Sequence, residues 1–143
     1  MKVRFVKLNE NAITPTYGSL QAAGADLYYP GDEFEIAPGE TYFAKIGIAV
    51  EIPEGYMGLI FARSGLSCKR GLAPANKVGV IDSDYRGEIT VALHNHGKLP
   101  QRVAFGERIA QLVITPYIRA EFELVGDLEK TDRGSGGFGS TGK

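Results

Sequence analysis

Lys45-Ile46-Gly47-Ile48-Ala49-Val50-Glu51-Ile52 shows the clearest periodicity in the chain. Its branched apolar residues fall at every second position, with small or charged residues between them. Side chains of a β-strand point alternately to the two faces of a sheet. The spacing therefore predicts an extended segment with one buried face.

Short apolar runs separated by Pro and Gly turns make up most of the remaining chain. We expect strands at residues 3–8, 23–29, 34–36, 56–62 and 108–114 and around Ile89, Val91 and Leu93, with Phe122 and Leu124 completing the core. Residues 64–70 are the one segment suited to a short helix. Many short strands with almost no helical periodicity predict an all-β sandwich, barrel or jelly roll.

The composition is that of a single soluble globular domain. The chain has 143 residues, of which 43% are apolar and 23% charged, and this length can bury a core. Its 19 glycines exceed the usual share of about 7%, so turns should be frequent. The 16 basic and 17 acidic residues give a net charge of −1, which argues against a general nucleic-acid binder or a polybasic membrane module.

The start of the chain and the single cysteine bear on its location. Lys2, Arg4 and Lys7 interrupt any apolar core of a signal peptide, and no apolar run approaches the ~20 residues that cross a bilayer. Cys68 cannot form an intrachain disulfide and has no neighbouring His to activate it, so it is interpreted as structural or incidental. We therefore expect a soluble protein in a reducing, cytoplasmic location.

Residues 79–89 place two acids and an aromatic between two strand-like runs. Asp and Gly favour turns, so the simplest interpretation is a surface hairpin with a solvated acidic tip. Tyr85 does not fit that interpretation, because a large aromatic side chain in a turn must pack against something or meet a ligand. The turn is therefore either a plain hairpin or half of a binding site.

Four other segments carry groups suited to anions or metals. Arg63-Ser64-Gly65-Leu66 precedes the expected helix, where unpaired N–H groups favour a phosphate, although a capping Ser and a surface Arg would look the same. Gln111 lies in an expected strand, and its simpler interpretation is a polar residue on an exposed face of that strand. Asp26, flanked by small residues, is either a metal-linked carboxylate or a strand-end acid.

The fourth of these segments is the glycine-rich end of the chain, residues 133–142. It has the amides, hydroxyls and Arg of a phosphate-binding loop, but it lacks the Gly-Lys-Ser/Thr ending of a Walker A motif. Its composition cannot build a core, so a flexible tail is the alternative.

The order of these segments resembles that of the five motifs of the trimeric dUTPase family, over essentially the whole chain. The motifs are Ala23-Gly24-Ala25-Asp26-Leu27, Arg63-Ser64-Gly65-Leu66, residues 76–85, residues 106–111, and Arg133-Gly134-Ser135-Gly136-Gly137-Phe138-Gly139-Ser140-Thr141-Gly142. The last of them is highly specific. Ala62 stands where many members carry Pro, and no functional position departs from the pattern.

The resemblance implies a homotrimer of distorted jelly-roll β-barrels, each with one short helix. Residues 1–127 would form the barrel, and residues 128–143 a flexible arm that closes over an active site at a subunit interface. The implied reaction is Mg²⁺-dependent hydrolysis of dUTP to dUMP and pyrophosphate, which limits uracil incorporation into DNA and supplies dUMP for dTMP synthesis. Neither a nucleic acid nor a membrane is an implied partner.

The resemblance also implies roles for individual residues. Asp82 would deprotonate the attacking water, Tyr85 would stack under the deoxyribose, and Asp84 would be a structural acid. Residues implied to read the uracil edge are Asn76 and the backbone at Gly79, Val80 and Ile81. Residues implied to hold phosphates are Arg63, Ser64, Gly65, Gln111, Arg133, Ser140 and Thr141, and Gly139 is implied to bind the substrate. Phe138 would cover the uracil, and Asp26 would support Mg²⁺ through a bound water.

Two other functions are weighed against this one. A dCTP deaminase shares the fold but carries a catalytic Glu in the strand after the turn, where this chain has Ala92. A non-catalytic β-sandwich binding module would leave the order of the five motifs unexplained.

Overall fold

The computed structural model describes residues 1–137 and confirms the all-β fold class, with one short helix among these residues. The elements are β1 Arg4–Lys7, β2 Thr16–Tyr17, β3 Ala25–Tyr28, β4 Phe34–Ile36, β5 Thr41–Lys45, β6 Ile48–Glu51, β7 Tyr56–Phe61, α1 Ser64–Arg70, β8 Leu72–Pro74, β9 Gly79–Ile81, β10 Thr90–Asn95, β11 Gln101–Val103 and β12 Arg108–Pro116. In this part of the chain, no helix combines the length and the apolar character needed to cross a membrane.

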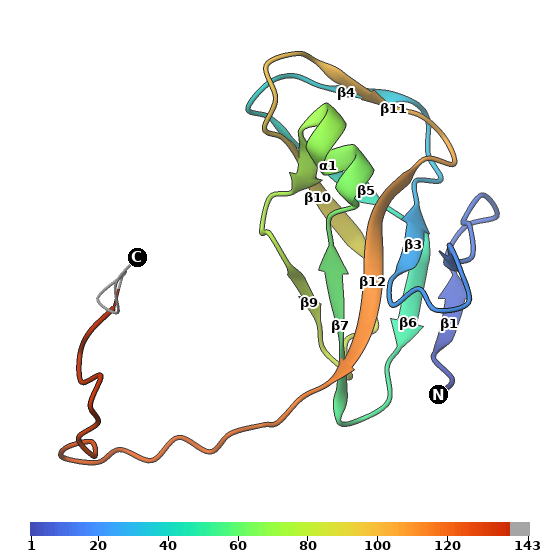
Figure 1. The fold of residues 1–143 in the computed structure, drawn as a ribbon. Helices are drawn as coiled ribbons and strands as arrows, with labels where there is room; N and C mark the ends of the chain where they lie inside the picture. Colours follow the sequence, from blue (N-terminus) through green and yellow to red (C-terminus); the bar gives the residue numbers. More distant parts are fainter. Residues whose placement is uncertain (138–143) are drawn as a thin grey trace.

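The strands form a distorted jelly roll of four antiparallel sheets (Figure 1). The largest sheet has the order β2-β3-β12-β7-β9, and a second sheet has the order β5-β10-β8. The pairs β1-β6 and β11-β4 complete the barrel. Because β12 lies between β3 and β7 in this sheet, residues of the N-terminal, central and C-terminal parts of the chain lie side by side.

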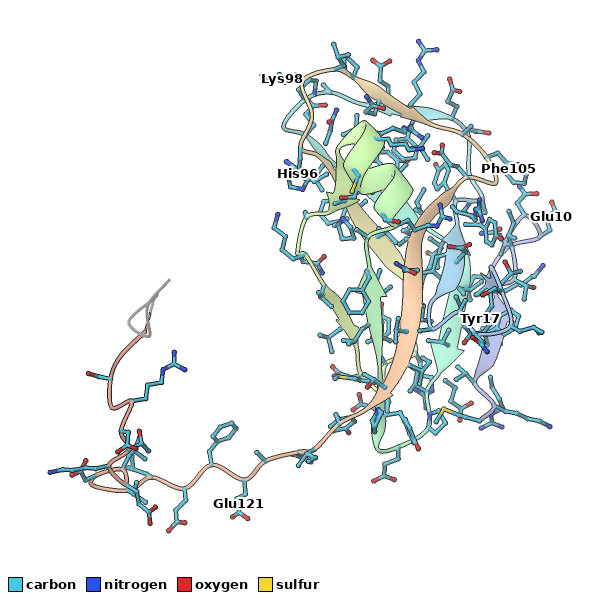
Figure 2. All side chains as sticks on the ribbon, viewed as in Figure 1. Glu10, Tyr17, His96, Lys98, Phe105 and Glu121 are labelled. Atoms are coloured by element: carbon cyan, nitrogen blue, oxygen red, sulfur yellow. The ribbon has the colours of Figure 1, made fainter. Side chains whose placement is uncertain are left out.

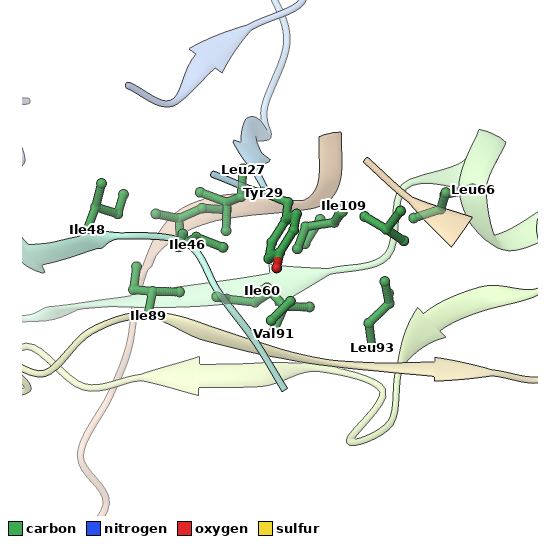
Figure 3. Close-up of a cluster of buried hydrophobic side chains, with 14 of the residues drawn as sticks. Leu27, Tyr29, Ile46, Ile48, Ile60, Leu66, Ile89, Val91, Leu93 and Ile109 are labelled. Carbon is green, nitrogen blue, oxygen red and sulfur yellow. The ribbon is translucent and has the colours of Figure 1, made fainter. Parts of the chain in front are cut away.

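Apolar side chains from the two larger sheets fill the space between them (Figure 3). Leu27, Ile60 and Ile109 come from the five-stranded sheet, and Val91 and Leu93 from the three-stranded sheet. All five side chains are at most 3% exposed. Burial of a Leu or Ile side chain contributes about 1.5–3 kcal/mol, so this shared core holds the sheets together.

The periodic stretch at residues 46–52 buries the predicted face, but it is not one strand. Ile46, Ile48, Val50 and Ile52 are at most 4% exposed. Gly47, at φ +72°, bends the chain between β5 and β6. The bend allows Ile46 N to donate to Ile89 O (3.1 Å) while Ile89 N donates to Ile48 O (2.9 Å). Every second side chain therefore stays buried although the strand is interrupted, and the spacing did not reveal this interruption.

The helix has the predicted bounds, whereas the predicted hairpin is absent from the described residues. α1 ends at Gly71, which has the left-handed φ of 67° that favours glycine at this position. The two strands flanking residues 82–89 do not pair with each other. β9 pairs with β7, and β10 pairs with β5 and β8. The turn therefore crosses from one sheet to the other, and this crossing opens a hollow behind it.

The prediction that Phe122 and Leu124 complete the core is wrong. Both side chains are at least 96% exposed, and the chain has neither helix nor strand from residue 117 to residue 137. Figure 2 shows Glu121 on this extended segment, away from the sheets. The core ends instead within β12.

Candidate active site

A pocket of about 260 Å³ lies between β9, β10 and the connection that joins them. Its lining residues are Ile60, Pro74, Asn76, Gly79, Val80, Ile81, Asp82, Tyr85, Glu88, Ile89, Thr90, Val91 and Ala92. All six candidates that the sequence offers between residues 76 and 85 are therefore gathered in one cavity. The cavity has both apolar walls and polar groups, as small-molecule sites do.

The wall formed by β9 offers an unpaired strand edge. One edge of β9 bonds to β7, and β9 is the last strand in its sheet within residues 1–137. A tight turn before it, in which Val78 N donates to Asn76 O (2.7 Å), places Asn76 at the pocket. A side chain at Gly79 would come within 3.4 Å of Asn76 Nδ2. Backbone donors and acceptors and one amide can therefore read the edge of a planar base here.

Asp82 stands at the mouth of the pocket and is exposed. Within residues 1–137 its carboxylate has no hydrogen bond or ion pair with another side chain. It also borders a larger hollow of about 990 Å³. A carboxylate that is open to water and not committed to a cation can accept a proton from a bound water molecule.

Tyr85 is held in place and still faces the pocket. Its hydroxyl donates to Glu88 O (3.1 Å), and its backbone N donates to Asp82 O (3.2 Å). Its ring lies so close to Gly87 that a Cβ there would be 2.5 Å from the Tyr85 Cζ. The side chain nevertheless remains 43% exposed, so it packs on one side and is accessible to a ligand on another.

A second group of candidates surrounds the buried carboxylate of Asp26, which is 7% exposed. Arg63 Nε donates to its Oδ1 (2.6 Å), and Arg108 Nη1 donates to its Oδ2 (3.2 Å). Gln111 lies opposite Asp26 in the sheet, and its Nε2 donates to Ala62 O (2.9 Å). One carboxylate with two guanidinium groups leaves a net positive charge, which suits an anionic ligand.

The start of α1 lies beside this second group and is open. Arg63 is the N-cap residue, and no side chain within residues 1–137 caps the helix. Ser64 and Gly65 are exposed, and nothing lies within 4 Å of where a Gly65 side chain would begin. Ser64 is therefore the first helical residue and not the capping residue of the simpler interpretation, so its hydroxyl is free to contact a ligand.

The two groups lie at different ends of the five-stranded sheet. Asp82 follows Ile81, which pairs with Gly58, whereas Gln111 pairs with both Phe61 and Asp26. Asp82 is thus level with Met57 of β7, which lies four residues before Phe61 along that strand. Across the sheet, β9 is three strand spacings from β3. At about 3.3 Å per residue and about 4.8 Å per strand, Asp82 and Asp26 are roughly 20 Å apart. Within one chain the two groups are therefore well separated.

Arg133 is the C-terminal candidate that the structure describes, and it is not among the residues that line the pocket. Arg133 is exposed, and its Nε donates to Gly136 O (2.9 Å) in the segment that leads away from the barrel. Phe138, Gly139, Ser140 and Thr141 lie outside the described residues.

Sequence reasoning missed two charged residues near these groups. Arg108 completes the neutralisation of Asp26, and a signal existed, because a buried acid among small residues requires cations. Glu88 lines the pocket, accepts from Gly47 N (3.0 Å), and lies 3.7 Å from Lys45 Nζ. Its position depends on the crossing between sheets, so no local pattern could reveal it.

Comparison with known proteins identifies relatives along the whole chain. The profile of the dUTPase family matches residues 10–142. The deoxyuridine 5'-triphosphate nucleotidohydrolase of Desulfitobacterium hafniense is 49% identical over 144 residues, which cover 99% of this chain and 95% of that protein.

Solved structures of phage proteins share the fold. The Staphylococcus bacteriophage 80alpha dUTPase with dUPNHPP superposes with a TM-score of 0.92 at 30% identity and covers 99% of both chains. A mutant dUTPase of phage phi11 of S. aureus, described as revealing the coordination of a structural Mg(II) ion, has a TM-score of 0.81 at 28% identity, covering 91% of this chain and 100% of that one. With its fold, its pocket and its nearly full-length relatives in agreement, this chain belongs to the dUTPase family.

Proposed function

We propose that this protein hydrolyses dUTP to dUMP and pyrophosphate. The observation that carries the proposal is the single pocket that gathers Asn76, the open edge of β9, Asp82 and Tyr85. The phage 80alpha relative binds dUPNHPP, an imido analogue of dUTP, on the same fold. Such a reaction keeps uracil out of DNA and supplies dUMP for dTMP synthesis.

The proposed chemistry is an attack of water on the α-phosphorus. The Asp82 carboxylate accepts a proton from the water while the water oxygen bonds to phosphorus. The bond from phosphorus to the α–β bridging oxygen then breaks, and pyrophosphate leaves. Transfer of this kind needs positioning and charge neutralisation more than covalent participation by the protein. The exposed, unpaired carboxylate of Asp82 supports this role.

The pocket walls account for the choice of nucleotide. Asn76 and the β9 backbone pair with the edge of uracil, and cytosine would leave polar groups unpaired. The Tyr85 ring lies against the deoxyribose and leaves no room for a 2′-hydroxyl. Its bond to Glu88 O fixes the ring before substrate arrives, which reduces the cost of ordering it.

The remaining residues act from other subunits of a homotrimer. Arg63, Ser64, Gly65 and Gln111 of a second subunit hold the phosphates, and the arm of residues 128–143 closes the site from a third. Within that arm, Arg133, Gly139, Ser140 and Thr141 contact phosphates and Phe138 covers the uracil. The separation of roughly 20 Å between Asp82 and Asp26 within one chain supports a shared site.

The residues also fit a hydrated Mg²⁺ that enters with the nucleotide. Within residues 1–137 no group of three or more His, Cys, Asp or Glu side chains could enclose a metal ion. A carboxylate has about four lone-pair positions, so Asp26 can hold two guanidinium groups and still accept a hydrogen bond from a metal-bound water. When bound, Mg²⁺ neutralises phosphate charge and needs little more from the protein. Asp26 would hold its water.

Ala92 lines the pocket at the position where a dCTP deaminase would carry its catalytic acid. A methyl group cannot transfer protons, so deamination lacks its essential group here. We also infer a cytoplasmic site of action, which agrees with the single cysteine.

The test is release of pyrophosphate from dUTP, dTTP, dCTP and UTP in the presence of Mg²⁺, with ammonia release from dCTP measured in parallel. We expect release from dUTP alone and no ammonia. The control is Asp82→Asn, which should still bind dUTP but lose about two to four orders of magnitude in kcat. Absence of turnover with dUTP would favour a binding module, and equal rates with dTTP would refute the assigned specificity.

A further inference from the structure

Arg86 is bonded to the turn that carries Asp82. Its Nη1 donates to two carbonyl oxygens of that turn, Ser83 O at 2.7 Å and Tyr85 O at 2.9 Å. The turn is also closed by Tyr85 N donating to Asp82 O. A charged donor makes stronger hydrogen bonds to carbonyl oxygens than a neutral one does, so the guanidinium group clamps the backbone directly after Asp82.

The other side of the same guanidinium group is anchored to a different sheet. Arg86 Nη2 lies 4.0 Å from Glu51 Oε1, and Glu51 is also paired with Arg4. Glu51 belongs to β6, opposite Arg4 of β1 in the register of that pair. Glu51 therefore places a negative charge beside Arg86, which favours the position of the guanidinium group at the turn without a direct hydrogen bond.

The two functional side chains of the turn depend on this clamp unequally. Tyr85 has further supports in its hydroxyl bond to Glu88 O and its packing against Gly87. Within residues 1–137 the Asp82 carboxylate has no side-chain partner. The backbone of the turn is therefore what places the Cβ atom of Asp82 and limits where its carboxylate can reach. A change in that backbone would move Asp82 more than Tyr85.

We infer that Arg86 is a positioning residue that aims the Asp82 carboxylate at the attacking water, an inference that rests on the proposed dUTP hydrolysis. The fork of an arginine can contact carbonyl oxygens and a carboxylate at once, whereas the single nitrogen of lysine cannot keep the same geometry. Arg86 acts through Asp82 and does not touch the substrate. Its loss should lower kcat and leave KM nearly unchanged.

The test compares steady-state dUTP hydrolysis by Arg86→Met, Arg86→Lys and Glu51→Gln with that of the wild type. Met keeps an apolar stem but removes the charge and all donors. The matched control is Arg102→Met, since Arg102 is an exposed arginine of β11 that pairs with Glu33 and Glu35 and takes no part in the proposed site. Thermal unfolding of each variant reports whether the fold is kept.

We expect Arg86→Met to lower kcat about tenfold or more with KM within about threefold, because small misplacements of reacting groups are costly. Arg86→Lys and Glu51→Gln should show smaller losses in kcat, and Arg102→Met none. If Arg86→Met does not fold, the two conservative variants carry the test. A kcat within twofold of the wild type in the folded Arg86 variants would overturn the inference.

A double-mutant cycle separates positioning from a general structural effect. In the Asp82→Asn background, Arg86→Met should cause no further loss of kcat, because the group that it positions is already gone. A loss as large as in the wild-type background would also overturn the inference. Absence of dUTP turnover in the wild-type protein would refute the proposed function itself, which is a distinguishable result.

Discussion

Mixing two inactive variants tests whether the active site is shared between subunits. Asp82→Asn removes the proposed base, and Arg63→Gln removes a proposed phosphate ligand at the other end of the sheet, while Arg108 still neutralises Asp26. Arg63 is bonded to Asp26, which lies roughly 20 Å from Asp82 in the same chain, so we expect Asp82 and Arg63 to reach one substrate from different chains. Each variant alone should therefore be inactive in every site of its homotrimer.

In randomly assembled mixed trimers, some sites regain both wild-type groups. A site is intact only if the subunit giving the turn is the Arg63→Gln chain and its neighbour is the Asp82→Asn chain. Each condition is met in half of the cases for an equal mixture, so about one quarter of the sites should work. The two chains would be unfolded together, refolded and assayed for pyrophosphate release, with mixing of the folded variants as the control.

A recovered activity near one quarter of that of refolded wild type is the expected result. Activity no greater than the sum of the two parents, in refolded material of confirmed mixed composition, would refute the reasoning. It would mean that one chain supplies both groups to its own site.

Three further perturbations follow from particular contacts. Gly87→Ala should displace the Tyr85 ring, which packs against Gly87, and break its hydrogen bond to Glu88 O, a bond worth about 1 kcal/mol. The KM for dUTP should therefore rise, and discrimination against UTP should weaken. Unchanged KM values for both nucleotides would contradict this prediction. Removal of residues 133–143 should leave the melting temperature unchanged, because the described part of that segment lies outside the core. It should abolish most turnover, because the proposed arm would no longer close the site. Full activity would show that the arm has no role. Burial, and then the Tyr42 hydroxyl, raise the pKa of Tyr29 to about 12. The stability that this residue contributes is therefore complete below pH ~10 and is lost as the pH rises toward 12. In urea unfolding, the free energy of unfolding should fall less over this pH range for Tyr29→Phe than for wild type, and equal falls would contradict the assignment.

The local backbone of the candidate site could be predicted in part from the sequence, because it is formed by short continuous segments. Residues 76–85 include a tight turn, an edge strand and a second turn, and each of these is specified by Asn, Gly and Asp residues within the segment. The helix at residues 64–70 was predictable for the same reason, since Gly71 ends it locally.

The sheet partners could not be predicted in this way. Residues 79–89 have every local mark of a hairpin, yet β9 and β10 join different sheets. Ile89 is fully buried and bonds to the backbone on both sides of Gly47. The burial of Ile89 thus draws β10 away from β9, and a long-range contact overrides the local preference. The prediction for Phe122 and Leu124 was wrong for the opposite reason: they are apolar by composition, but within residues 1–137 they follow the last strand and remain exposed.

Asp26 has ion-pair partners that the sequence analysis did not identify. A lone strand-end acid would be solvated, and a direct metal ligand would need further acids nearby. The structure instead shows a buried carboxylate that orients Arg63 and Arg108. Removing the carboxylate leaves two guanidinium groups without their partner, although both are partly exposed to water, which limits the cost in stability. Asp26→Asn should therefore disturb the arginines as well as any metal-bound water. A KM for dUTP that rises at saturating Mg²⁺ would identify the arginine contribution, whereas a defect that excess Mg²⁺ fully corrects would assign Asp26 to the metal alone.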